Sequence, residues 1–143
     1  MRKAIIMAAF IFAAALFTMC KENGTIPVES NWEVQYLNVN GEQIEVPEDH
    51  KATIAFLKDY KIAGETGCNR FFGNYNAEGN TLKLDNIGCT RMMCPHMQFE
   101  SAYLNILNEA AEFSIGEDSM TIRDKSGNLV AVLKKIEPVA LEN

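Results

Sequence analysis

Short runs of alternating apolar and polar residues recur along this chain, and tight-turn signals separate them. Such period-two alternation is typical of β-strands with one buried face. The apolar members of these runs are, in order, Trp32, Val34 and Tyr36; Ile44 and Val46; Ala52, Ile54 and Phe56; residues 71–75; Leu82 and Leu84; Phe113 and Ile115; Met120 and Ile122; and residues 129–136. Asn40-Gly41 favours a type I′ hairpin, because both central positions of that turn need a positive φ. Many short strands joined by tight turns predict a sandwich, a roll or a barrel.

One segment has a helical period instead. Pro95 suits the first position of a helix, where its missing N–H costs nothing. Apolar residues at helical spacing follow it through about residue 112, namely Phe99, Tyr103, Ile106, Leu107 and Ala110. Such a stripe can bind a partner, but it is more typical of a helix that packs on a sheet. The sequence therefore predicts a mainly β fold with one helix (α+β).

The first twenty residues resemble a bacterial export signal. Arg2 and Lys3 precede the uncharged run 4–17, which has about the length of a signal-peptide core and is too short to span a bilayer of about 30 Å. Residues 16–20 (Leu-Phe-Thr-Met-Cys) resemble a lipobox, in which Cys20 is acylated and the signal is cut before it. Cleavage near residues 13–15 and an uncleaved anchor are the alternatives. We expect a signal peptide at 1–19, a lipid-tethered linker at 20–30 and one domain at 31–143.

The charge of the expected mature chain limits its partners. Without Arg2 and Lys3 it keeps 11 basic and 19 acidic residues, a net charge of −8. An acidic chain with no basic cluster argues against nucleic acid, whose binding depends on Lys and Arg contacts to phosphate. Acidity also gives no attraction to an anionic membrane surface, so we expect membrane contact only through the lipid.

Two motifs in separate segments add a family resemblance. The first is Gly67-Cys68-Asn69 with Gly73 and Tyr75, and the second is Thr90, Met92 and Cys94, followed by Glu100. Trp32, Asn40-Gly41, Phe56 and Leu82-x-Leu84 accompany them. Together these residues resemble the META/HslJ domain family over about residues 31–136.

The resemblance implies a curled antiparallel sheet that forms a barrel-like roll, with a helix at about 96–112 packed on it. It also implies a bacterial envelope lipoprotein, at the periplasmic face or the outer-membrane surface, with no established enzymatic activity. One branch of the family is associated with heat shock and antibiotic tolerance. Cys89, directly before Thr90, departs from the family pattern.

The cysteines provide the remaining chemistry. If Cys20 carries lipid, Cys68, Cys89 and Cys94 are left in an oxidising compartment, where a pair is expected to form a disulfide. We predict Cys68–Cys94, with Cys89–Cys94 as the alternative. Closing the longer loop would stabilise the fold by about 3 to 4 kcal/mol. Either pairing leaves one thiol over.

The sequence thus predicts a non-catalytic envelope lipoprotein that binds a small ligand or an envelope protein in stress or antibiotic tolerance. We expect no enzymatic activity, because there is no Gly-x-Ser-x-Gly elbow and no pairing of the scattered glutamates. We also expect no cofactor and no bound metal, since the cysteine spacing is not a common one for zinc and oxidation would remove the thiolate ligands. The alternative is a thiol-redox or metal-binding protein that uses Cys68, Cys89 and Cys94, with His96 completing a tetrahedral zinc set. His50, in an acidic loop, is interpreted as a solvated residue.

Overall fold

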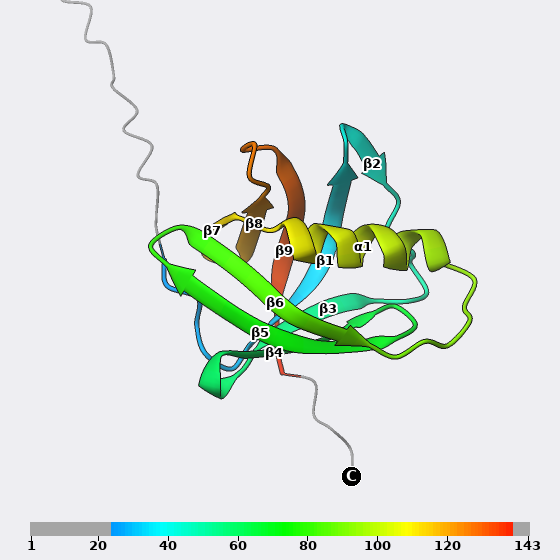
Figure 1. Cartoon of the computed structure of the whole chain (residues 1–143), viewed down its shortest axis with the longest axis horizontal. Coiled ribbons are helices and arrows are strands. Elements are labelled where there is room, and N and C mark those ends of the chain that lie inside the picture. Colours follow the sequence, from blue (N-terminus) through cyan, green and yellow to red (C-terminus); the bar gives the residue numbers. More distant parts are fainter. Residues whose placement is uncertain (1–23, 139–143) are drawn as a thin grey trace, which may run out of the picture.

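The structure, a computed structural model, describes residues 24–138. The predicted signal peptide and the predicted lipid site Cys20 lie outside these residues. Figure 1 shows the chain, whose strands are β1 (Ser30–Val39), β2 (Glu42–Ile44), β3 (Ala52–Phe56), β4 (Lys61–Thr66), β5 (Arg70–Glu78), β6 (Thr81–Cys89), β7 (Glu112–Ile115), β8 (Ser119–Arg123) and β9 (Leu129–Ile136). The helices are the short 3₁₀ turn η1 (Lys58–Tyr60) and α1 (Met97–Glu109). No helix within residues 24–138 is long and apolar enough to cross a membrane.

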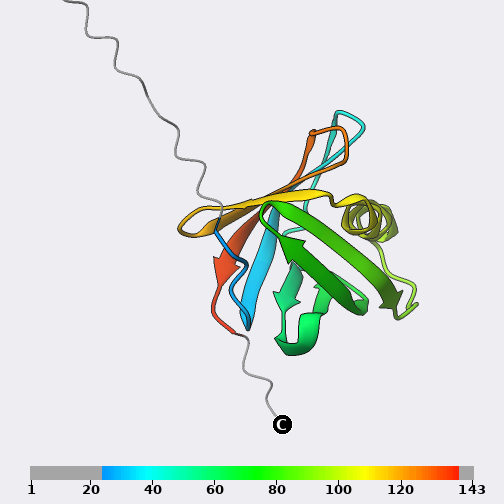
Figure 2. The ribbon, with the colours of Figure 1, turned by 60° about the vertical axis from the view of Figure 1, so that its left-hand side comes forward.

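The strands close into a barrel. Each strand from β3 to β9 pairs antiparallel with the next, β1 pairs with β3, and β1 also pairs with β9 to complete a ring of eight strands. β2 extends β1 beyond the ring as the hairpin predicted at Asn40-Gly41. Figure 2 shows the curled sheet, with α1 seen nearly end-on beside it. The predicted mainly β, barrel-like fold with one packed helix is confirmed.

Apolar side chains from the sheet and the helix form one core. The buried members from the sheet include Trp32, Leu37, Ile54, Phe56, Phe71, Met120 and Ile122, and α1 adds Phe99, Tyr103, Ile106 and Leu107. The Tyr103 hydroxyl also donates a hydrogen bond to the Thr53 carbonyl oxygen at 3.1 Å, which fastens α1 to β3. Ile26 is 3% exposed and joins this core from the segment predicted as a linker.

Three local features differ from the sequence predictions. β4 was not predicted, because Gly64 interrupts its apolar pattern; a Cβ at Gly64 would lie 2.2 Å from the Thr53 oxygen of β3 and 2.6 Å from the Phe71 ring. The return strand β2 ends at Ile44, before Val46. α1 ends at Glu109, several residues before the predicted end, because the backbone at Ala110 turns to φ −54° and ψ 127°.

Candidate functional site

The two sequence motifs meet at one corner of the barrel. The turn between β4 and β5 lies beside the segment that leads from β6 to α1, and the Cys68–Cys94 disulfide joins the two across 26 positions of sequence, with a Cα–Cα distance of 6.2 Å. The predicted pairing is therefore confirmed, and the alternative Cys89–Cys94 pairing is wrong.

Asn69 occupies the centre of this corner, and its side chain is completely buried. Its amide nitrogen donates to a Glu100 carboxylate oxygen at 2.8 Å and to the Met92 carbonyl at 3.1 Å. Its amide oxygen accepts from the Met92 backbone N–H at 2.8 Å and from the Thr90 hydroxyl at 3.0 Å. One side chain thus ties the β4–β5 turn to the segment after β6 and to the helix.

Glu100 is the acidic member of this network and is only 7% exposed. The Thr66 hydroxyl donates to its Oε2 at 2.5 Å, beside the bond from Asn69. A carboxylate in the first turn of α1 also interacts favourably with the helix dipole. No buried side-chain nitrogen or oxygen in the described part of the chain lacks a hydrogen-bond partner. The polar atoms of the network are therefore engaged internally, and they hold the start of α1 against the barrel.

The other motif residues have separate local roles. Gly67 has a φ of +95°, which L side chains rarely adopt. A Cβ at Gly73 would lie 2.8 Å from the Asp85 oxygen of the neighbouring strand. Tyr75 packs edge-on against Phe56 with ring centroids 5.0 Å apart. Gly73 and Tyr75 lie further along β5 than the network, and the Met92 side chain is 61% exposed, so that Met92 joins the network through its backbone alone.

Cys89, at the end of β6, is a free and partly buried thiol. Desolvation raises the pKa of this thiol, and the charge of Glu100 raises it further, against an opposing effect of Arg91. A raised pKa lowers the reactive thiolate fraction. The zinc set that would combine Cys68, Cys89 and Cys94 with His96 is contradicted, because two of its sulfurs form the disulfide. A different set of possible metal ligands lies nearby, since ligand atoms of Asp49, His50 and His96 all lie within 4.8 Å of one another.

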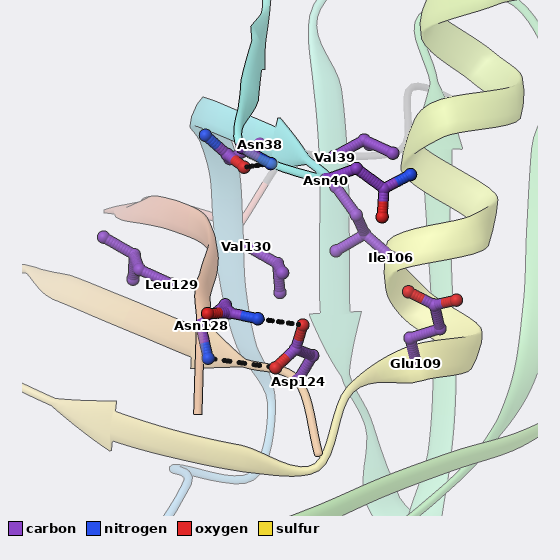
Figure 3. A pocket seen from close by; sticks show the side chains of 10 residues that line it. Asn38, Val39, Asn40, Ile106, Glu109, Asp124, Asn128, Leu129 and Val130 are labelled. Atoms are coloured by element: carbon purple, nitrogen blue, oxygen red, sulfur yellow. Dashed lines mark hydrogen bonds between the residues drawn. The ribbon is translucent and has the colours of Figure 1, made fainter. Parts of the chain in front are cut away.

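A pocket of about 480 Å³ opens at another place on the molecule, between α1 and two hairpin tips (Figure 3). Its lining comprises residues 38–41 of the β1–β2 hairpin, Ile106 and Glu109 of α1, and Asp124 with residues 128–130 of the β8–β9 hairpin. The sequence predicts the Asn40-Gly41 hairpin that contributes to this lining. It gives no sign that this hairpin meets the β8–β9 tip, because their proximity depends on the closing contact between β1 and β9.

Asp124 gives this pocket a fixed negative charge. Its carboxylate accepts from the Asn128 side-chain amide at 3.1 Å and from the backbone N–H groups of Asn128 and Ser126 at 2.9 Å each. The side-chain hydrogen bond from Asn128, followed by the backbone bonds, holds the pKa of Asp124 below its usual value of 3.8. The exposed Glu109 adds a second carboxylate to the lining.

The fold and this corner define a small closed β-barrel domain with one packed helix, braced by a disulfide and a buried polar network. The META domain family model matches residues 25–137, and the chain belongs to the META domain family.

Solved structures resemble the chain in fold. A protein from Burkholderia xenovorans, solved by NMR, is 23% identical with a TM-score of 0.67, covering 78% of this chain and 84% of its own. A DUF4847 family protein from Bacteroides vulgatus is 16% identical with a TM-score of 0.56, covering 78% of this chain and 96% of its own. No curated protein sequence matches the chain.

Proposed function

We propose that this protein is a non-catalytic binding module of the bacterial cell envelope, anchored by lipid on Cys20, and that its ligand or partner occupies the pocket between α1 and the two hairpin tips. The observation that carries this proposal is the contrast between a barrel interior filled by side chains and an open, polar pocket at the hairpin tips. Barrels of eight strands are narrow enough for side chains to fill them.

The lining of the pocket favours particular ligands. Glu109 and Asp124 supply carboxylates, Asn38, Asn40 and Asn128 supply amides, and Ile106 with Val130 supplies apolar surface (Figure 3). Polar groups at defined positions fix the orientation of a bound small molecule, and the amides and carboxylates of this lining can serve that purpose. Two carboxylates on an acidic chain disfavour anions, so the chemistry suits a cationic or neutral hydrogen-bonding ligand.

The test of binding uses backbone amide NMR spectra with three probes: putrescine as a diamine, trehalose as a neutral disaccharide, and inorganic phosphate. Putrescine or trehalose is expected to shift the signals of Asn38 and Asn128, and phosphate to leave them unchanged. Glu109→Gln should weaken the putrescine response, whereas Glu112→Gln, at an exposed site outside the pocket, should not. Shifts from none of the probes, or equal shifts all over the surface, would refute a ligand site here.

The envelope location rests on separate support. The Cys68–Cys94 disulfide suits an oxidising compartment, and the N-terminal segment has the pattern of a lipoprotein signal. In bacterial fractionation, the native protein should partition with membranes and carry an acyl-modified Cys20, as intact mass would show. Cys20→Ser should lose both properties. Membrane association that survives this substitution would exclude the lipid anchor.

The absence of catalysis and the role in stress tolerance are also parts of the proposal. The network around Glu100 supports the first, because internal hydrogen bonds engage its carboxylate. A strain without the gene should lose heat or antibiotic tolerance, and Glu109→Gln should fail to restore it while Glu112→Gln restores it. Full restoration by Glu109→Gln would separate the phenotype from the pocket.

A further inference from the structure

We infer that Asp49, His50 and His96 form a binding site for a divalent transition-metal ion of the zinc class. Nε2 of His96 lies 3.3 Å from Oδ1 of Asp49, and Nε2 of His50 lies 3.6 Å from Oδ2 of the same carboxylate. All three residues can place a ligand atom within 4.8 Å of the others. Imidazole nitrogen and carboxylate oxygen are both ordinary zinc ligands.

The separations fit the size of such an ion. With Zn–N and Zn–O bonds of about 2.0 to 2.1 Å and tetrahedral angles, neighbouring ligand atoms lie about 3.3 Å apart. The two observed separations are close to this value. The histidine rings are inclined at 65° with centroids 5.5 Å apart, so they are not stacked and both turn a nitrogen toward Asp49. The two nitrogens face different oxygens of this one carboxylate, and ligand atoms of all three residues lie within 4.8 Å of one another.

The two loops that carry the ligands are fastened to the same turn. A Cβ at Gly67 would lie 3.2 Å from His50, so the loop of Asp49 and His50 packs directly on this glycine. Cys68, the next residue, is bonded to Cys94, which lies two positions before His96. The disulfide and the close packing thus bring ligands from distant parts of the sequence together before any ion binds. Such preorganisation reduces the entropic cost of binding.

Exposure leaves room for further ligands. The side chains of Asp49, His50 and His96 are 67%, 44% and 38% exposed. Three protein ligands with solvent access match zinc sites that keep a position for water or another molecule. His96 precedes α1 without a side-chain capping hydrogen bond, so its imidazole has no capping role that competes with a metal. Imidazole also accommodates Co²⁺, Ni²⁺ and Cu²⁺, which makes Co²⁺ a usable spectroscopic probe.

The test is calorimetric titration of the full chain with Zn²⁺, and absorption titration with Co²⁺, after alkylation of its free thiols. Alkylation removes thiolate ligands and leaves the disulfide intact. His50 and His96 are the only two histidines in the sequence, so an ion bound through imidazole must be bound at this site. We expect one ion per chain. His50→Ala, His96→Ala and Asp49→Asn should each weaken binding by on the order of tenfold or more, since even residues that only support metal ligands have effects of that size.

Asp59→Asn is the matched control, because Asp59 is an exposed acidic residue outside the cluster; it should leave the affinity unchanged. Far-UV circular dichroism will show that the half-exposed positions tolerate substitution. A folded native chain that gives no Zn²⁺ heat and no Co²⁺ spectrum would refute the site and leave surface ion pairs between Asp49 and the histidines. Affinity that persists in the His50→Ala/His96→Ala double variant would place the ion elsewhere and equally overturn the inference. Neither outcome bears on the pocket between α1 and the hairpin tips.

Discussion

Replacing Asn69 with Ala should destabilise the fold severely although it removes only a few atoms. The side chain is buried and exchanges hydrogen bonds with Glu100, with the Thr90 hydroxyl and with both backbone groups of Met92. A neutral hydrogen bond contributes about 1 kcal/mol net, and one to a charged group contributes more. Four such bonds amount to about 3 to 5 kcal/mol, a large share of the 5 to 15 kcal/mol typical of a domain.

Urea unfolding followed by fluorescence measures this loss. Trp32 is the only tryptophan and is 1% exposed, so its emission reports exposure of the core. Asn108→Ala is the matched control, because Asn108 makes one hydrogen bond, to the Leu104 oxygen at 2.9 Å, on the exposed face of α1. Its cost should stay within about 0.5 kcal/mol. A cost for Asn69→Ala below about 1 kcal/mol, or equal to that of the control, would refute the reasoning.

Asn69→Asp separates hydrogen bonding from packing, because it keeps the shape of the side chain and replaces the amide donor with an oxygen. That oxygen would face the Glu100 carboxylate and the Met92 carbonyl where the nitrogen now donates. When two carboxylates lie side by side, repulsion between their charges raises the pKa of one of them. The variant should therefore be least stable at neutral pH and regain stability relative to the native protein as pH falls and the pair takes up a proton. A difference from the native protein that does not change with pH would contradict this account.

Three further perturbations test other parts of the structure. Replacing Cys68 and Cys94 by Ser should lower the free energy of unfolding by about 3 to 4 kcal/mol, since the bond spans 26 positions; unchanged urea midpoints would exclude a stabilising role. Gly64→Ala should lower the free energy of unfolding by about 1 to 3 kcal/mol, because the added Cβ would overlap a backbone oxygen of β3. Gly24→Ala is the control and should be tolerated, since the nearest atom to its Cβ would lie 3.4 Å away. Equal thermal midpoints for the two variants would contradict this. Because the folded-state pKa of Asp124 is lowered, its contribution to stability is complete above the usual value of 3.8 and is lost as pH falls through the lower folded value. Asp124→Asn should therefore flatten the acid side of the plot of stability against pH. Parallel plots for the variant and the native protein would disprove this account.

The strands were predictable where a local pattern specifies them. Trp32 and Val34 alternate with polar residues along β1, and Asn40-Gly41 encodes its hairpin, so both were correctly predicted. β4 was not predicted, because Gly64 interrupts its apolar pattern. Glycine is needed there because Phe71 and the β3 backbone lie too close to leave room for a Cβ. The space around a glycine is a property of the folded barrel, and periodicity carries no information about it.

The candidate sites could be predicted only in part for the same reason, because they depend on contacts between residues that are distant in the sequence. The disulfide was predicted because an oxidising compartment makes a pairing chemically expected, while Cys89–Cys94 stayed open as the alternative to Cys68–Cys94. The contact of Asn69 with Glu100 spans 31 positions and has no comparable local signal. His50 was interpreted as solvated for the same reason, since only the disulfide-linked turn brings His96 to it.

These observations separate residues that shape the domain from residues of the two proposed binding sites. Asn69, Thr66 and Glu100 satisfy one another inside the protein, and their motif therefore marks how the β4–β5 turn is joined to α1. The side chains of the proposed sites lie on loops outside this network, at the hairpin tips that include Asp124 and on the loops of His50 and His96. In this chain the motif residues therefore account for the fold, and they do not by themselves specify a ligand. Binding experiments on this protein should therefore target the loop residues, and stability experiments should target the motif.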